Sequence, residues 1–146
     1  MMLTEHFTLE EMMVSEWAAR NGIDNAPHGP FVIENLRLLC AHVLEPLRRI
    51  LRIPIVVTSG YRNPEVNKAI GGSETSDHMQ GKAADIIVPR VSVAWVFDTI
   101  AKNLPFDQVI DEFGQWVHVS YRLNACRGQK LIARFVNGKP QFTPAG

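Results

Sequence analysis

The longest hydrophobic pattern in the chain lies between residues 32 and 50 and has the spacing of an amphipathic helix. Its apolar residues recur every three or four positions, which places them on one helix face. They are Val32, Leu36, Leu39, Cys40, Val43, Leu47 and Ile50. Pro46 falls inside this segment and lacks an amide N–H, so we expect it to kink the helix or divide it in two. We expect this helix to be the main scaffold against a sheet.

Three shorter segments are also predicted to be helical. Thr8 and Glu11 have the spacing of a capping box, which predicts a helix that begins after Thr8 and runs to about Ala19. A short helix is expected over 64–69, and a longer one over 91–103, where apolar residues again recur at helical spacing.

Short runs rich in β-branched and aromatic residues predict the strands. They are Pro54–Thr58, Ile86–Val88, Phe106–Ile110, Gln115–Tyr121, Leu131–Val136 and Gln141–Phe142. Ile86–Val88 is short and wholly apolar, which predicts a strand buried on both faces. The third and fourth runs are expected to form a hairpin, and Asn137–Gly138 is a strong turn pair between the last two. The pattern indicates an α+β fold, with helices packed on a small antiparallel sheet.

Length and charge limit the classes of function. The 146 residues suit a single domain spanning 1–146. Fifteen basic and fifteen acidic residues give a formal net charge of zero, which argues against a nucleic-acid partner. Cys40 and Cys126 are far apart and predict free thiols in a reducing compartment. We find no signal peptide and no membrane-spanning run, so we expect cytoplasmic synthesis, and we expect a monomer.

Two histidines and one aspartate are candidate metal ligands. His78 precedes Gly81, whose backbone freedom allows the chain to turn back toward Asp85 at the start of a predicted strand. His118 lies in the predicted strand 115–121. Two imidazoles and one carboxylate leave the fourth position of a zinc ion open, as in catalytic sites. The spacing alone is equally compatible with a solvated loop histidine and an ordinary strand residue.

The residues around these candidates resemble a known signature. The signature reads Ser76-x-His78-x-x-Gly81-x-Ala83-x-Asp85, followed by Trp116-x-His118. It is similar to that of the zinc D-Ala-D-Ala carboxypeptidase family, which includes phage endolysin peptidases and vancomycin-resistance D,D-dipeptidases. The resemblance extends to residues 58–64 and covers most of the chain. It implies a fold shared with the hedgehog signalling domain, and one Zn²⁺ per chain held by His78, Asp85 and His118.

The resemblance leaves the catalytic base open. Some family members carry an acidic residue three positions before the last histidine ligand, but here that residue is Gln115, which cannot accept a proton. Hedgehog-like members carry a glutamate six positions before that histidine, which corresponds to Glu112. Asp111 is the alternative, because it lies in the same predicted hairpin. We favour Glu112 as the base.

Two further residues are expected to contact the substrate. The D,D-dipeptidase relatives carry an arginine in a motif comparable to that of Arg62, which implies that Arg62 binds a carboxylate or stabilises a developing negative oxygen. Ser76 is expected to bind substrate or to orient its loop, and a turn-stabilising role is equally compatible with its position.

These residues predict a zinc metallopeptidase that hydrolyses an amide bond in peptidoglycan stem or cross-bridge peptides. Both a carboxypeptidase and an endolysin-type endopeptidase fit this prediction. We expect such an enzyme, of phage or prophage origin, to act on the cell wall after release. The alternative is a non-catalytic, zinc-stabilised module for wall binding or phage assembly, and the absence of an acid at position 115 supports it. A phage virion or host factor with a purely structural zinc ion is a further alternative.

Overall fold

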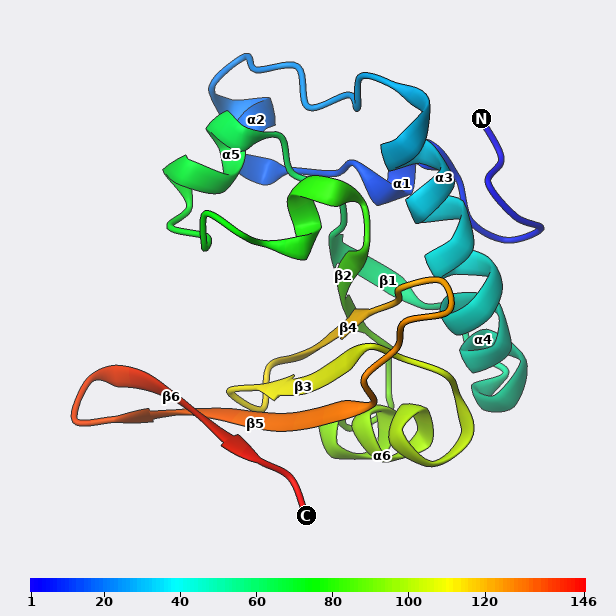
Figure 1. The fold of residues 1–146 in the computed structure, drawn as a ribbon, viewed down its shortest axis with the longest axis vertical. Helices are drawn as coiled ribbons and strands as arrows, with labels where there is room; N and C mark the ends of the chain where they lie inside the picture. Colours follow the sequence, from blue (N-terminus) through cyan, green and yellow to red (C-terminus); the bar gives the residue numbers. More distant parts are fainter.

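The six strands form one sheet in the order β1-β2-β4-β3-β5-β6 in the computed structural model, which describes all 146 residues (Figure 1). The strands are β1 (Val56–Ser59), β2 (Ala83–Ile87), β3 (Gln108–Glu112), β4 (Trp116–Ser120), β5 (Gln129–Val136) and β6 (Lys139–Pro144). All neighbours are antiparallel except β3 and β5, which run parallel. The predicted α+β fold is confirmed, with this one parallel pair in an otherwise antiparallel sheet.

Most helices precede the sheet in the chain, and α6 packs on the sheet. The α-helices are α1 (Leu9–Met12), α2 (Glu16–Arg20), α3 (Pro30–Leu39), α4 (Glu45–Leu51), α5 (Pro64–Ala69) and α6 (Val93–Asn103). Two further helical turns are the π-helical η1 (Cys40–Leu44) and the 3₁₀-helical η2 (Asp77–Gln80). Every helix is too short or too polar to traverse a lipid bilayer.

The long helix predicted over 32–50 is present as α3, η1 and α4 in direct succession. Pro46 lies in the first turn of α4, where a missing amide N–H is tolerated. The wider π turn comes immediately before it, and the amide of Glu45 donates to the carbonyl of Cys40. Pro46 therefore coincides with a change of helix type and the chain stays helical.

The single helix predicted from Thr8 to Ala19 is wrong, because the structure has two short helices there. The capping box at Thr8 and Glu11 is present and starts α1. Ser15 then acts as a second N-cap and accepts a hydrogen bond from the amide of Ala18. A strong N-cap inside the segment starts a new helix, which the predicted single helix did not allow for.

Strand alternation separates a core face of the sheet from a polar face. Ala84, Val117 and Val119 are completely buried on the core face, where the apolar faces of the helices complete one cluster. Asp85 and His118 are neighbours in register on the opposite face. Ile87 also lies on that face and is 37% exposed, so the prediction that Ile86–Val88 is buried on both faces is wrong at Ile87.

The predicted C-terminal hairpin is confirmed as β5 and β6, with the turn at Asn137–Gly138. Both turn residues have positive φ values, as this tight connection requires. Figure 1 shows the hairpin as a twisted ribbon that projects beyond the rest of the sheet. Since β5 pairs with β3, this ribbon extends the polar face of the sheet past the strand that carries Glu112.

Candidate metal centre

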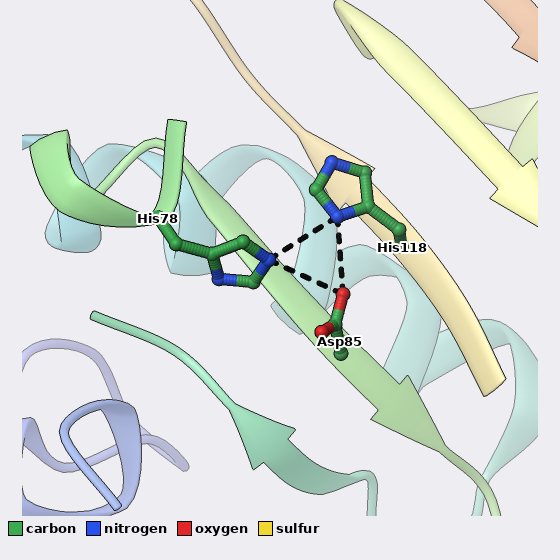
Figure 2. Close-up of side chains that lie close together, drawn as sticks. All are labelled: His78, Asp85 and His118. Carbon is green, nitrogen blue, oxygen red and sulfur yellow. Dashed lines mark hydrogen bonds and ion pairs between the residues drawn. The ribbon is translucent and has the colours of Figure 1, made fainter. Parts of the chain in front are cut away.

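Three side chains from three segments converge on one point of the polar face (Figure 2). Nε2 of His78 lies 3.3 Å from Oδ1 of Asp85, and Nδ1 of His118 lies 3.0 Å from the same oxygen. The two imidazole nitrogens are 3.3 Å apart. The residues predicted as metal ligands from the sequence are therefore neighbours in space.

Local sequence explains how His78 reaches the sheet. Ser76 caps the η2 turn by accepting a hydrogen bond from the amide of His78, and Gly81 ends the turn with a φ of 73°. A Cβ atom at position 81 would lie 2.6 Å from the carbonyl oxygen of Val32 on α3. Glycine is required here both for the positive φ and for the close approach of α3.

A second contact fixes the ring of His78. Its Nδ1 lies 2.7 Å from the carbonyl oxygen of Gly60, which can only accept, so Nδ1 carries a proton and Nε2 is the nitrogen that faces Asp85. Gly60 is itself held against α1, since a Cβ atom there would lie 2.1 Å from the carbonyl oxygen of Met12. The N-terminal helix thus supports the metal-binding form of His78.

The spacing of the three atoms suits a zinc ion. Bond lengths of about 2.0–2.2 Å in a tetrahedral site place neighbouring ligand atoms roughly 3.3 Å apart. The three observed separations are 3.0, 3.3 and 3.3 Å. Two imidazoles and one carboxylate also match the donor set of catalytic zinc sites, which keep a fourth position open. The residues present therefore fit this metal.

The electrostatics of the cluster also favour a cation. Burial of Asp85 opposes ionisation, but His78 and His118 outweigh it and hold the pKa of this carboxyl far below its ordinary value. Burial would lower the pKa of His118, yet the carboxylates of Asp85 and Glu112 raise it above its ordinary value of 6.5. The buried negative charge stabilises a positive charge placed among these atoms.

Glu112 lies beside this cluster on the same face of the sheet. Its Oε1 is 3.7 Å from Nδ1 of His118. Burial and the negative charge of Asp85 raise the pKa of Glu112, although His118, Trp116 and Arg62 partly offset this. The indole nitrogen of Trp116 is buried without a hydrogen bond of normal geometry. Glu112 is thus a carboxylate with increased proton affinity next to the predicted ligands.

Asp111 lies on the other face of the sheet. Its carboxylate accepts hydrogen bonds from the amide of Gly114 and from the guanidinium of Arg134, at 2.9–3.2 Å. Asp111 lines a cavity next to α6, away from the metal cluster. Gln115 is exposed at the hairpin turn. Of the two carboxylates considered for the base, only Glu112 lies at the cluster.

Arg62 is anchored to the same loop as His78. Its amide donates to the carbonyl of His78 at 3.1 Å, and its Nη2 donates to Oγ of Ser76 at 3.3 Å. Burial lowers the pKa of Arg62, while Asp85 and Glu112 partly restore it. Its Nε is buried without an acceptor. Its Nη1 makes no hydrogen bond within the protein and is not buried, so this end of the guanidinium is available to a bound ligand.

These side chains line one cavity of about 830 Å³. Sequence reasoning missed the part of its lining that follows residue 120, which comprises Arg122, Arg127, Leu131 and Phe142. No motif marks these residues, and only the sheet order brings the segment that contains them beside β3.

An α+β domain with a His-Asp-His cluster and an adjacent glutamate in a cleft has the features of a metallopeptidase. The family model for Peptidase M15 matches residues 5–120 of this chain. The chain belongs to this family of zinc-dependent peptidases, so its predicted membership of the zinc D-Ala-D-Ala carboxypeptidase family is confirmed. No protein with a curated description matches the chain.

Proposed function

We propose that this zinc peptidase hydrolyses an amide bond in peptidoglycan stem or cross-bridge peptides. One observation carries the proposal: a glutamate of raised pKa shares a cleft with a three-donor metal cluster. We assign His78, Asp85 and His118 as the zinc ligands, and Glu112 as the catalytic base. The zinc ion, when bound, supplies Lewis acidity toward water and toward the scissile carbonyl group.

Glu112 carries the proton in the proposed reaction. Its carboxylate accepts a proton from the attacking water as the new C–O bond forms. It then donates that proton to the amide nitrogen as the C–N bond breaks. A pKa raised toward neutral pH suits both steps, because the same group must gain and lose the proton.

Arg62 and Ser76 bind the substrate in this scheme. The carbonyl oxygen becomes negative as water adds, and the unpaired Nη1 of Arg62 is an available donor for it. Ser76 accepts hydrogen bonds from Arg62 and from the amide of His78, so its hydroxyl proton is free to bind a substrate carbonyl.

The shape of the cleft favours an endopeptidase over a carboxypeptidase. Gln108, Ile110 and Glu112 alternate along β3 and all line the cavity. Ile110 is opposite His118, so the cleft continues along the strand in both directions from the metal cluster. We infer that the substrate extends on both sides of the scissile bond. For access to the wall, we propose release by cell lysis, as with endolysins.

Matched variants on neighbouring residues test the proposal. We expect Glu112→Gln to retain zinc and to lose about 10²–10⁴-fold in the rate of muropeptide cleavage. The control is Asp111→Asn, which changes an adjacent carboxylate on the opposite face and is expected to cleave at a rate close to that of the unaltered protein. Unchanged cleavage by Glu112→Gln would move the base elsewhere.

The same experiment addresses the non-catalytic alternative. A wall-binding or assembly module would release no cleavage products from purified muropeptides, and Glu112→Gln would behave like the unaltered protein. Loss of zinc in His78→Ala, measured by metal analysis, would then be the only defect. Product analysis on defined muropeptides separates carboxypeptidase from endopeptidase cleavage, since only the former releases a single terminal residue.

A further inference from the structure

One end of the cleft carries a pair of arginines that the proposed reaction does not use. Arg122 and Arg127 both line the cavity and lie beyond the residues matched by the family model. They follow β4, near the position where Gln108 of β3 pairs with Ser120. This position is two residues, or about 7 Å of strand, from the pair formed by Ile110 and His118.

Asp107 fixes the orientation of both guanidinium groups. This aspartate is completely buried and accepts hydrogen bonds from Nε of Arg122 and from Nε and Nη2 of Arg127, at 2.8–3.1 Å. The amide of Arg127 also donates to it, at 3.0 Å. Nη2 of Arg122 is paired with Asp77, 2.6 Å away. The two side chains are therefore held in place before any ligand binds.

Each guanidinium still has donors for a ligand. Nη1 of Arg122 and Nη1 of Arg127 make no hydrogen bond within the protein. The side chains are 35% and 56% exposed. Oriented, partly dehydrated guanidinium groups are the usual protein partners of carboxylates.

We propose that Arg122 and Arg127 form a subsite for a carboxylate of the peptide substrate, about two residues from the scissile bond. This inference rests on the proposed function, because it places the peptide backbone along β3 with its scissile bond at the metal cluster. Gln108, opposite Ser120, and Leu131, beside Ile110, both line the cavity. The subsite selects substrates with a free carboxylate over those in which it is amidated.

Equilibrium binding to a non-cleaving variant tests this subsite. The zinc-loaded Glu112→Gln protein is titrated by calorimetry with a stem peptide whose carboxylates are all free, and with versions amidated at one carboxylate at a time. We expect amidation of one particular carboxylate to weaken binding about tenfold. Adding Arg127→Gln should reduce that effect to less than about twofold, because it removes the unpaired Nη1 donor proposed to bind the carboxylate. Within the protein, the Arg127 guanidinium is hydrogen-bonded only to Asp107.

Two further variants control for charge and folding. Lys130→Gln removes the same charge from the opposite face of the sheet, next to α6, and should preserve the tenfold discrimination. Arg127→Lys keeps the charge beside Asp107 but loses the planar fork, and should retain part of it. Thermal unfolding verifies that each variant is folded.

The outcomes separate this inference from the proposed function. Equal binding of all peptides, binding of none, or discrimination that survives Arg127→Gln would overturn the subsite. Cleavage of the same peptides by the unaltered protein is measured in parallel. Cleavage without discrimination between the peptides would support the peptidase and overturn the subsite. Discrimination without cleavage would support the subsite and overturn the proposed peptidase activity.

Discussion

The pH dependence of folding stability tests whether the buried carboxylate of Asp107 is ionised and stabilised by its arginines. Hydrogen bonds from Arg127 and Arg122 lower the pKa of Asp107 from 3.8 to about 2, against an opposing contribution from burial. Since one pKa unit corresponds to about 1.4 kcal/mol, the ionised carboxylate contributes about 2 kcal/mol to folding. Its side chain is inaccessible to solvent, so solvent screening reduces this contribution little.

The sign of the effect follows from the direction of the shift. A pKa that is lower in the folded protein gives a stabilisation that is complete above pH 3.8. This stabilisation is lost as the pH falls from 3.8 through about 2, where the folded protein also takes up the proton. Asp107→Asn cannot ionise, so it should be about 2 kcal/mol less stable than the unaltered protein at pH 6, with a difference that shrinks below pH 4.

Urea unfolding of both proteins between pH 2 and 7 measures this difference. A chelator is present throughout, so that release of metal at low pH does not contribute. Other carboxylates titrate in both proteins and cancel in the difference. A stability difference that stays constant from pH 6 to pH 2 would refute the assignment of the low pKa to Asp107 and its arginines.

Three further predictions concern the metal site and its support. Gly81→Ala should lose about 1–3 kcal/mol of stability and bind zinc more weakly, because the new Cβ would meet the carbonyl of Val32. Gly114→Ala is the control: its φ is similar but its surroundings are open, so it should lose about 1 kcal/mol. Urea unfolding and zinc titration measure both effects. Arg62→Lys should lower kcat about 100-fold in initial-velocity assays. Arg20→Lys, on the exposed face of α2, should leave kcat unchanged. Equal kcat values for Arg62→Lys and the unaltered protein would exclude Arg62 from the reaction. Zinc affinity should fall as the pH drops through the raised pKa of His118, because protons compete with zinc for Nδ1. Activity should therefore decline at acid pH and in the presence of a chelator. A rate that stays constant down to pH 4 would contradict the ligand assignment.

Local sequence information did not decide whether Glu112 or Asp111 is the catalytic base. Both residues follow the predicted strand Phe106–Ile110, and in the structure they are the last two residues of β3. Strand alternation places them on opposite faces, but it does not say which face carries the metal. That depends on the register of the β3–β4 hairpin, in which Glu112 is opposite Trp116 and Ile110 is opposite His118. A turn one residue longer or shorter would have exchanged the two faces, because side chains alternate with a period of two.

The C-terminal segment gives a second example. Its hairpin was predictable, because Asn137–Gly138 adopts the positive φ values of a tight turn through local conformational preferences. The parallel pairing of β5 with β3 was not, since it joins strands that are separated by β4 and a loop. The lining of the cavity by Leu131 and Phe142 follows from this pairing and could not be predicted from either residue alone.

The sequence by itself determined the helix caps, the strand segments, and the Ser-His-Gly-Asp and Trp-x-His motifs that identify the family, because these depend on residues a few positions apart. Only the tertiary structure decided that the atoms of His78, Asp85 and His118 meet at the spacing of zinc ligands, and that Glu112 rather than Asp111 faces them. Contacts between residues far apart in the chain depend on strand register and on the packing of whole elements, and these are properties of the folded chain as a whole.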